Sequence, residues 1–300
     1  MSMNITLKQI KVFATITKHK TLTISAEKLF LSKAAVSLSL AELEKQLGHS
    51  LFDRVNNRLV LNQEGKRLLP LADELLHRTQ DIGDLFKQSN TLNGELKLGA
   101  SDTIGNHLAP YLLRDFRQQT QHQQQSLFIS NTALICQKLI DYQLDIGLIE
   151  GKIQSEKILA KEWGQDEMCV VCSPDHPLSQ KPEILMRDLE SSKWLLREAG
   201  SGTREFFLRT IAPRLENWYE AFQLNTTEAI LNATTANLGL ACLSRLAANS
   251  AIQNKRVVEI PLPLDMTRRF WLLVHTEKYQ SPLLKSFIDF SSEWKQPKYD

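Results

Sequence analysis

The stretch "SAEKLFLSKAAVSLSLAELEKQLG", residues 25–48, reads as two short helices separated by a sharp break before Ser32. The second helix has an apolar face with three- and four-residue spacing, which indicates a buried side. This face consists of Val36, Leu40, Leu43 and Leu47. The opposite face is small and uncharged, being built from Ala34, Ser37, Leu38 and Ala41. Surface helices normally carry charged residues there, so this face is suited to a close approach to another surface.

The flanking sequence indicates a helix-turn-helix. Residues 7–19, "LKQIKVFATITKH", have the apolar spacing of an amphipathic helix. Two short helices joined by a tight turn, with the small Ala26 at their crossing, are typical of this motif. Its second helix lies in the DNA major groove with its N-terminal residues on the base edges. The alternative on this pattern alone is a helical hairpin in an ordinary bundle.

The next segment predicts a wing. Residues 51–65, "LFDRVNNRLVLNQEG", read as a short β-hairpin whose turn is Asn56 and Asn57, because asparagine tolerates positive φ. Arg54 and Arg58 flank that turn and are placed to reach phosphates or a minor groove. We therefore predict a winged helix-turn-helix with DNA contacts from Ser32, Lys33, Ala34, Ser37, Leu38, Arg54 and Arg58.

Charge is unevenly distributed along the 300-residue chain, whose net charge is +2. Residues 1–66 hold ten Lys and Arg against five Asp and Glu, a net +5, which leaves −3 for the remainder. A basic head on a mildly acidic body suggests that the head meets a polyanion. No signal peptide and no run of about 20 apolar residues is visible, so we expect a cytoplasmic protein without a membrane partner.

Cys169 and Cys172 have the CxxC spacing that zinc or redox sites use. They lie in "EMCVVCS", which reads as a strand, and residues three apart on a strand point to opposite faces. No second pair of ligands completes a metal set. Structural thiols are therefore the preferred interpretation.

Residues 63–93 are predicted to form a linker helix and a hinge, the hinge at residues 89–94. Asn62 is placed to cap the helix. Apolar positions at heptad spacing predict that two chains pair along it. The alternative is an amphipathic helix packed on its own body. The expected pairing positions are Leu68, Ala72, Leu75, Thr79, Ile82 and Phe86.

The remaining sequence alternates strands and helices, which predicts parallel sheets covered by helices. Strands are expected near 157–163 and 167–173, and helices at 105–119, 203–217 and 226–238. Hydroxyl residues follow several strands, at Ser101, Thr103, Thr132, Ser201, Thr203, Thr226 and Thr227. Helix N-termini at such junctions bind anions, although simple N-capping explains each junction taken alone.

No catalytic set is visible. No nucleophile elbow, phosphate-binding loop or dinucleotide fingerprint occurs, so we expect neither an enzyme nor a bound cofactor.

Taken together, these residues resemble the LysR-type transcriptional regulators along nearly the whole chain. The most specific segments are residues 7–65, ending in "LE…LG…LFDR", and "SPDHPL", "LLREAGSGTRE" and "GLACLSR" in the body. The resemblance implies a DNA-binding domain at 1–62, a linker at 63–93 and a two-lobed effector domain at 94–300, similar to periplasmic binding proteins. Lobe I would comprise about 94–162 and 267–300, and lobe II about 163–266.

The resemblance also implies partners. It implies a homodimer or homotetramer on double-stranded promoter DNA, with RNA polymerase as a further partner and a small effector in the cleft. The segments "REAGSGTRE" and "TTEAILNATTANLGLACLSR" look closest to the CysL-like branch of sulfur-metabolism regulators, which implies a small sulfur oxyanion such as sulfite or sulfate. The implied effector-binding positions are Ser101, Asp102, Thr103, Thr132, Ser201, Gly202 and Thr203.

Two alternatives stay open for the function. A small organic acid would use the same donors, and a solute-binding protein would share the body, although its head would not be basic. The recognition helix also departs from the family, because many members have Gln, Pro and Arg at the positions of Lys33, Ala34 and Leu38. The target DNA sequence is therefore not carried over.

Overall fold

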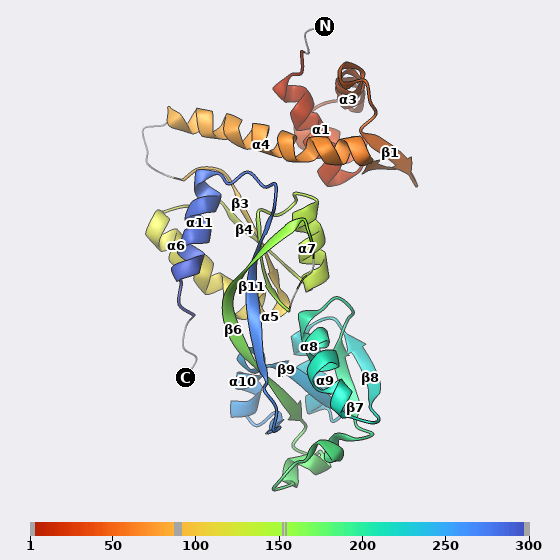
Figure 1. Ribbon diagram of the computed structural model, residues 1–300, viewed down its shortest axis with the longest axis vertical. Coiled ribbons are helices and arrows are strands. Elements are labelled where there is room, and N and C mark those ends of the chain that lie inside the picture. Colours follow the sequence, from red (N-terminus) through yellow and green to blue (C-terminus); the bar gives the residue numbers. More distant parts are fainter. Residues whose placement is uncertain (1–3, 87–91, 152, 154, 297–300) are drawn as a thin grey trace.

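The computed structural model describes residues 4–86, 92–151, 153 and 155–296. Part of the expected hinge, residues 89–91, lies outside these ranges. Figure 1 shows a helical head above one long helix, and below that helix a body of two lobes stacked end to end. The C-terminal helix α11 (Pro282–Glu293) returns to the upper lobe, beside α6 (Ala109–Thr120) (Figure 1).

The head has the expected elements. Helices α1 (Leu7–His19), α2 (Leu22–Leu29) and α3 (Lys33–Leu47) precede the hairpin of β1 (Phe52–Val55) and β2 (Arg58–Leu61). Ser32 caps α3, since its hydroxyl accepts a hydrogen bond from the Ala35 N–H at 3.1 Å. Gly48 ends α3 with a φ of 73°. Asn56 and Asn57 have φ values of 48° and 61°, so the predicted two-residue turn is confirmed.

The core of the head is formed where the three helices meet the wing. Phe13, Val36 and Leu43 are fully buried, and the Phe13 and Phe52 ring centroids lie 5.5 Å apart. The apolar stripe read from the sequence is therefore the inner face of α3, and its small-residue face points outward. Burial of this stripe stabilises the packing of α3. The free energy gained is about 25 cal/mol per Å² of apolar surface removed from water.

The long helix α4 (Gln63–Leu85) begins at Asn62, whose side-chain oxygen accepts from the Gly65 N–H at 2.9 Å. The expected pairing surface needs one correction. Ala72 is 1% exposed and packs in the head's own core, with Leu68 half-buried beside it, so Ala72 is not available to a partner chain. Leu75, Thr79, Ile82 and Phe86 are exposed. The spacing of apolar residues identifies the buried face of a helix, but it does not show whether that face packs on the same chain or on a partner chain.

Lobe I is built on three parallel strands, with β3 (Leu96–Ser101) between β4 (Gln125–Ser130) and β5 (Ile146–Glu150). Helices α5 (Asp102–His107), α6 (Ala109–Thr120), α7 (Thr132–Ile140) and α11 (Pro282–Glu293) belong to it. Its largest core joins Leu98, Phe116 and Phe287. One helix was expected over 105–119, but the chain breaks at Leu108, before Pro110, because proline at the start of a turn lacks the N–H that would continue the helix.

Lobe II repeats this plan with β7 (Lys193–Arg197) between β8 (Tyr219–Leu224) and β9 (Leu240–Ser244), again parallel. It carries helices α8 (Gly202–Thr210), α9 (Thr227–Thr235) and α10 (Arg245–Gln253), and the short strand β10 (Val258–Ile260). Three 3₁₀ turns complete it, at Pro177–Gln180, Met186–Leu189 and Ala212–Arg214. The helix expected over 203–217 ends at Thr210, and Pro213 lies in the 3₁₀ turn that follows.

Two long strands connect the lobes, and here the expectation of purely parallel sheets is wrong. The segments expected as separate strands near 157–163 and 167–173 form one strand, β6 (Ile158–Cys172). It pairs antiparallel with β11 (Thr267–His275) over most of its length, and β11 also pairs antiparallel with β5. The described strands thus form a mixed sheet through both lobes (Figure 1). Because β6 and β11 run through both lobes, the predicted lobe boundaries stay predictions.

The CxxC pair has the divergent geometry expected of a strand. Cys169 belongs to one buried cluster of lobe II and Cys172 to the cluster on the other side of the sheet. Burial raises the pKa of the Cys172 thiol to about 11, so it stays protonated and unreactive at neutral pH. The described residues contain no cluster of side chains able to hold a metal ion. Within the same ranges, no helix is long and apolar enough to cross a membrane.

Two glycines of α4 offer a matched test of how the helix docks on the head. A Cβ at Gly65 would lie 2.2 Å from the Leu51 carbonyl oxygen, whereas a Cβ at Gly83 would meet no atom within 4 Å. We expect Gly65→Ala to destabilise the protein by about 1–3 kcal/mol. Gly83→Ala should stabilise it by about 0.5–1 kcal/mol through helix propensity. Urea unfolding followed by circular dichroism measures both, and equal effects would contradict the docking of α4 seen here.

Candidate functional site

The predicted DNA-contacting residues share one property, which is exposure. Ser32, Lys33, Ala34, Ser37 and Leu38 at the start of α3, and Arg54 and Arg58 on the wing, are all exposed. Leu38 is 65% exposed. The Ser32 hydroxyl accepts the capping bond and keeps its own proton to donate. This surface fits a major groove at α3 and the neighbouring backbone at the wing.

The two lobes meet at an interface that we call the cleft, because the expected effector positions lie there. The ends of β3 and β5 in lobe I face the beginning of α8 in lobe II, and the lobes touch there. A Cβ on Gly202 would lie 2.5 Å from the Glu150 carbonyl oxygen, so only glycine allows this approach. The backbone N–H of Ala133 also donates to the Gly200 carbonyl at 3.1 Å across the same gap. The two lobes are therefore in close contact at the cleft.

Arg268, on β11, is the only guanidinium in the described residues that bonds to hydroxyls of both lobes. Its side chain is 1% exposed and is paired with the equally buried Asp166 of β6. It donates to Thr203 Oγ1 at 3.0 Å and to Thr103 Oγ1 at 3.4 Å. Burial raises the pKa of the Asp166 carboxyl above its usual value, although Arg268 opposes that shift. Since each threonine accepts from Arg268, each keeps its own hydroxyl proton to donate.

Glu150, at the end of β5, contacts the beginnings of three helices. Its carboxylate Oε1 accepts from the Thr103 N–H of α5 at 3.0 Å. Its carbonyl oxygen accepts from Thr132 Oγ1 of α7 at 3.1 Å and lies against Gly202 of α8. Glu150 itself is 3% exposed. A buried carboxylate thus occupies the helix start where the sequence predicted an anion.

A second buried arginine bridges the lobes at the edge of the cleft. Arg197 of β7 lies 3.0 Å from Asp102 and 2.8 Å from Glu198. Asp102 also accepts a hydrogen bond from the Thr227 hydroxyl at 2.5 Å, and Asn131 donates to Glu198 at 3.1 Å. These bonds join the two lobes at the edge of the cleft. The prediction of Asp102 as an effector contact is corrected, because its carboxylate is committed to Arg197 and Thr227.

The other predicted effector residues divide into two groups. Ser101 is buried beneath the cleft and bonds to the backbone of Leu148 and Glu150, and the Thr132 hydroxyl is committed to Glu150. Thr103, Ser201, Gly202 and Thr203 lie together at the two facing helix starts, and all four are buried. Sequence reasoning missed Arg268 and Asp166. The available signal was an arginine at an inward position of the apolar strand "TRRFWLLVH".

Comparisons with known proteins agree with this architecture. Residues 7–66 match the family described as the bacterial regulatory helix-turn-helix protein, lysR family, and residues 89–296 match the LysR substrate binding domain. The HTH-type transcriptional regulator YeiE of Escherichia coli is 37% identical over 96% of this chain and 97% of its own. CysL of Bacillus subtilis is 28% identical over 92% of this chain and 98% of its own.

Among solved structures, a full-length OxyR variant of Pseudomonas aeruginosa has a similar fold. It superposes with a TM-score of 0.76 at 21% identity, over 98% of each chain. A winged helix-turn-helix followed by a two-lobed ligand-binding domain defines a ligand-responsive DNA-binding regulator. The chain belongs to the LysR family of transcriptional regulators and is a regulator, not an enzyme.

Neighbouring arginines on β11 test the role of the buried pair. Arg268→Gln leaves Asp166 buried without its counter-charge, so we expect a loss of about 3–5 kcal/mol. Arg269→Gln removes an exposed pair with Glu162 and should cost at most about 1 kcal/mol. The midpoint of chemical unfolding, followed by tryptophan fluorescence, separates the two. Equal midpoints would show that Arg268 does not hold the cleft together.

Proposed function

We propose that this regulator binds promoter DNA as a homodimer or homotetramer in the cytoplasm and responds to a small protonated oxyanion, hydrogen sulfite being the foremost candidate. The observation that carries the proposal is the buried group of Arg268, Thr103 and Thr203 between the lobes. The likeness of "REAGSGTRE" to the CysL-like branch and the 28% identical CysL relative favour a sulfur oxyanion.

The donors at the facing helix starts suit a compact anion. The hydroxyls of Thr103 and Thr203 both accept from the Arg268 guanidinium, so they lie close together. Ser201 and Thr203 lie at the N-terminus of α8, a helix of nine residues whose dipole favours negative charge. A ligand there would bridge the two lobes and favour the closed cleft.

Glu150 distinguishes between oxyanions. Its carboxylate can only accept hydrogen bonds. A ligand beside Glu150 must therefore either carry a proton that it can donate or push the Glu150 side chain aside. Hydrogen sulfite keeps a proton near neutral pH, whereas sulfate has none and would meet an uncompensated like charge. Of the two sulfur anions implied by the resemblance, the contacts of Glu150 therefore favour sulfite over sulfate.

A small organic acid is the second candidate. A hydroxy acid would present a carboxylate to the donors and a hydroxyl proton to Glu150, so the same contacts accommodate it. Net charge offers no choice between the candidates, because Asp166 already neutralises Arg268. Direct binding measurements separate them.

The exposed face of α4 supports pairing of two chains. Leu75, Ile82, Leu85 and Phe86 are 43%, 58%, 79% and 84% exposed, which leaves an apolar stripe beyond the head. Pairing there would place two recognition helices on two half-sites. Contact with RNA polymerase follows only from the family resemblance.

Lys33 and Arg54 should contribute to DNA binding through charge. We expect Lys33→Ala or Arg54→Ala to weaken promoter binding about tenfold and to lower the salt dependence by about one phosphate contact each. Lys45→Ala is the matched control, since Lys45 is exposed at the other end of α3. Fluorescence anisotropy at several salt concentrations measures the DNA affinity of each variant. Equal binding curves for the three variants would contradict the assignment of this DNA-binding face.

Glu150→Gln should relax the choice of anion. In the unaltered protein, sulfite should raise the thermal unfolding midpoint and sulfate should not, because only a ligand that binds the folded state stabilises it. Glutamine still accepts the Thr103 bond and offers an N–H donor, so the variant should respond to sulfate as well. Glu205→Gln, exposed on the first turn of α8, is the control. A sulfate response in the unaltered protein would contradict this role of Glu150.

A further inference from the structure

Lys278, in the turn after β11, is buried between the linker helix and lobe I. Its side chain is 2% exposed, and its ammonium lies 3.0 Å from Asp73 of α4 and 3.0 Å from Asp145 of lobe I. Burial lowers the pKa of Lys278, but the two carboxylates outweigh that effect and hold the pKa above its usual value. A permanently charged lysine therefore joins two separate parts of the molecule.

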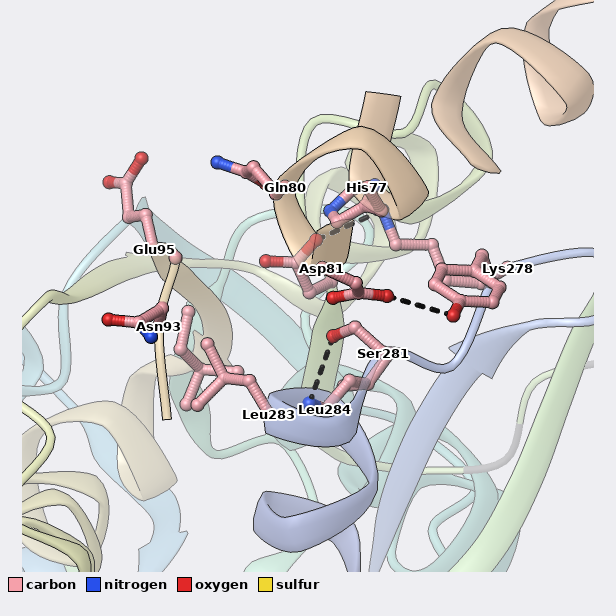
Figure 2. A pocket seen from close by; sticks show the side chains of 13 residues that line it. His77, Gln80, Asp81, Asn93, Glu95, Lys278, Ser281, Leu283 and Leu284 are labelled. Atoms are coloured by element: carbon pink, nitrogen blue, oxygen red, sulfur yellow. Dashed lines mark hydrogen bonds and ion pairs between the residues drawn. The ribbon is translucent and has the colours of Figure 1, made fainter. Parts of the chain in front are cut away.

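A second polar contact lies beside the first. The Tyr279 hydroxyl donates to Asp81 of α4 at 2.9 Å, and the Arg78 guanidinium lies 4.7 Å from the centre of the Tyr279 ring. Figure 2 shows Lys278 beside a small cavity, together with the bond that Asp81 of α4 accepts from Tyr279. The cavity, about 20 Å³, is large enough for one water molecule. The contact between α4 and lobe I is thus polar at Lys278 and Tyr279.

The residues of this contact lie at the far ends of the strands that form the cleft. Asp145 comes immediately before β5, and Glu150 of the cleft ends that strand. Lys278 follows β11, and Arg268 of the cleft lies near its beginning. The two strands pair side by side, with Leu273 opposite Gly147 and Phe270 opposite Glu150. At about 3.3 Å per residue, β5 spans about 15 Å between the cleft and the linker helix.

The balance of charge in this contact makes release possible. Two carboxylates share one ammonium, so removal of Asp73 together with α4 would leave a neutral Lys278 and Asp145 pair in lobe I. Asp73 would return to water and regain its hydration. An ionic contact of this kind contributes little net stability, because desolvation offsets much of the attraction. The contact can therefore open without leaving an unpaired buried charge on either side.

We propose that Asp73, Lys278 and Asp145 form a releasable joint that holds the linker helix to lobe I, and that β5 and β11 transmit a change in the cleft to this joint. The joint has two discrete arrangements, with Asp73 in contact or withdrawn. Its second part, the coupling to the cleft, rests on the proposed effector site. Its first part does not.

The joint itself is tested on the full-length protein without any effector. Asp73→Asn removes one carboxylate of the ion triad, and Tyr279→Phe removes the neighbouring bond while keeping the ring. Hydrogen–deuterium exchange should become about tenfold faster in peptides covering residues 73–85 and 276–281, with lobe II unchanged. Glu64→Gln, which breaks the exposed ion pair with Arg67 at the other end of the same helix, should leave exchange unchanged. Unchanged exchange in both joint variants would overturn the joint.

The coupling is tested with sulfite as the probe, by calorimetry on the unaltered protein and on Asp73→Asn. If sulfite binding opens the joint, then opening the joint must change sulfite binding by the same factor. A coupled joint therefore changes the sulfite affinity by at least about fivefold. Equal affinities, together with faster exchange in Asp73→Asn, would refute the coupling and keep the joint. If sulfite fails to bind the unaltered protein, the proposed effector is wrong, and the effector-free exchange result still decides whether the joint exists.

Discussion

The pairing of Arg268 with Asp166 is the constraint around which the body of this protein is arranged. A guanidinium that is 1% exposed needs a counter-charge and hydrogen-bond acceptors, since an isolated buried charge would cost several kcal/mol. The counter-charge comes from β6, and the acceptors come from one threonine of each lobe. One buried side chain thus links the two lobes across the cleft.

The strand β11 connects this pair to a second buried cation. At one end it carries Arg268, and beyond its other end lies Lys278, which has the same need for compensation and meets it from α4 and lobe I. Each buried cation lies where separate parts of the chain meet, and between them residues 270–274 of the strand are apolar and mostly buried. The contacts at the two ends of β11 are ionic and directional, whereas the packing between them is apolar and non-directional. Each lobe can therefore stay rigid while the ionic contacts at its boundary change.

This arrangement accounts for how a regulator can separate two tasks. The head presents exposed small and basic residues to DNA, and its stability comes from a core of its own that includes one side of α4. The cleft presents buried hydroxyls and a buried carboxylate, which are suited to selecting a small ligand. Neither surface needs the chemistry of the other, and α4 contacts both the head and the body.

Much of this could be predicted from the sequence, for reasons that are local. The head was predicted closely because its helices are bounded by capping residues such as Ser32 and Gly48, and its turn by Asn56 and Asn57. The strand-to-helix junctions were found from residue types that often cap helices, although Thr226 makes a side-chain capping bond and Ser101 and Ser201 do not. The interpretation of Ala72 was wrong for a related reason, since spacing identifies a helix face but not what covers it.

The sequence by itself determined the family, the winged head and the positions of the hydroxyl-bearing junctions, because these depend on contacts within a few residues. The tertiary structure alone decided which junctions face each other, that Glu150 occupies one helix start, and that Arg268 and Lys278 are buried centres of charge. The partners of those cations are far from them in sequence, and both cations lie within or beside β11, whose antiparallel pairing overturned the expected parallel sheets. Burial and pairing of a charge are properties of the assembled chain, so no local pattern of residues encodes them.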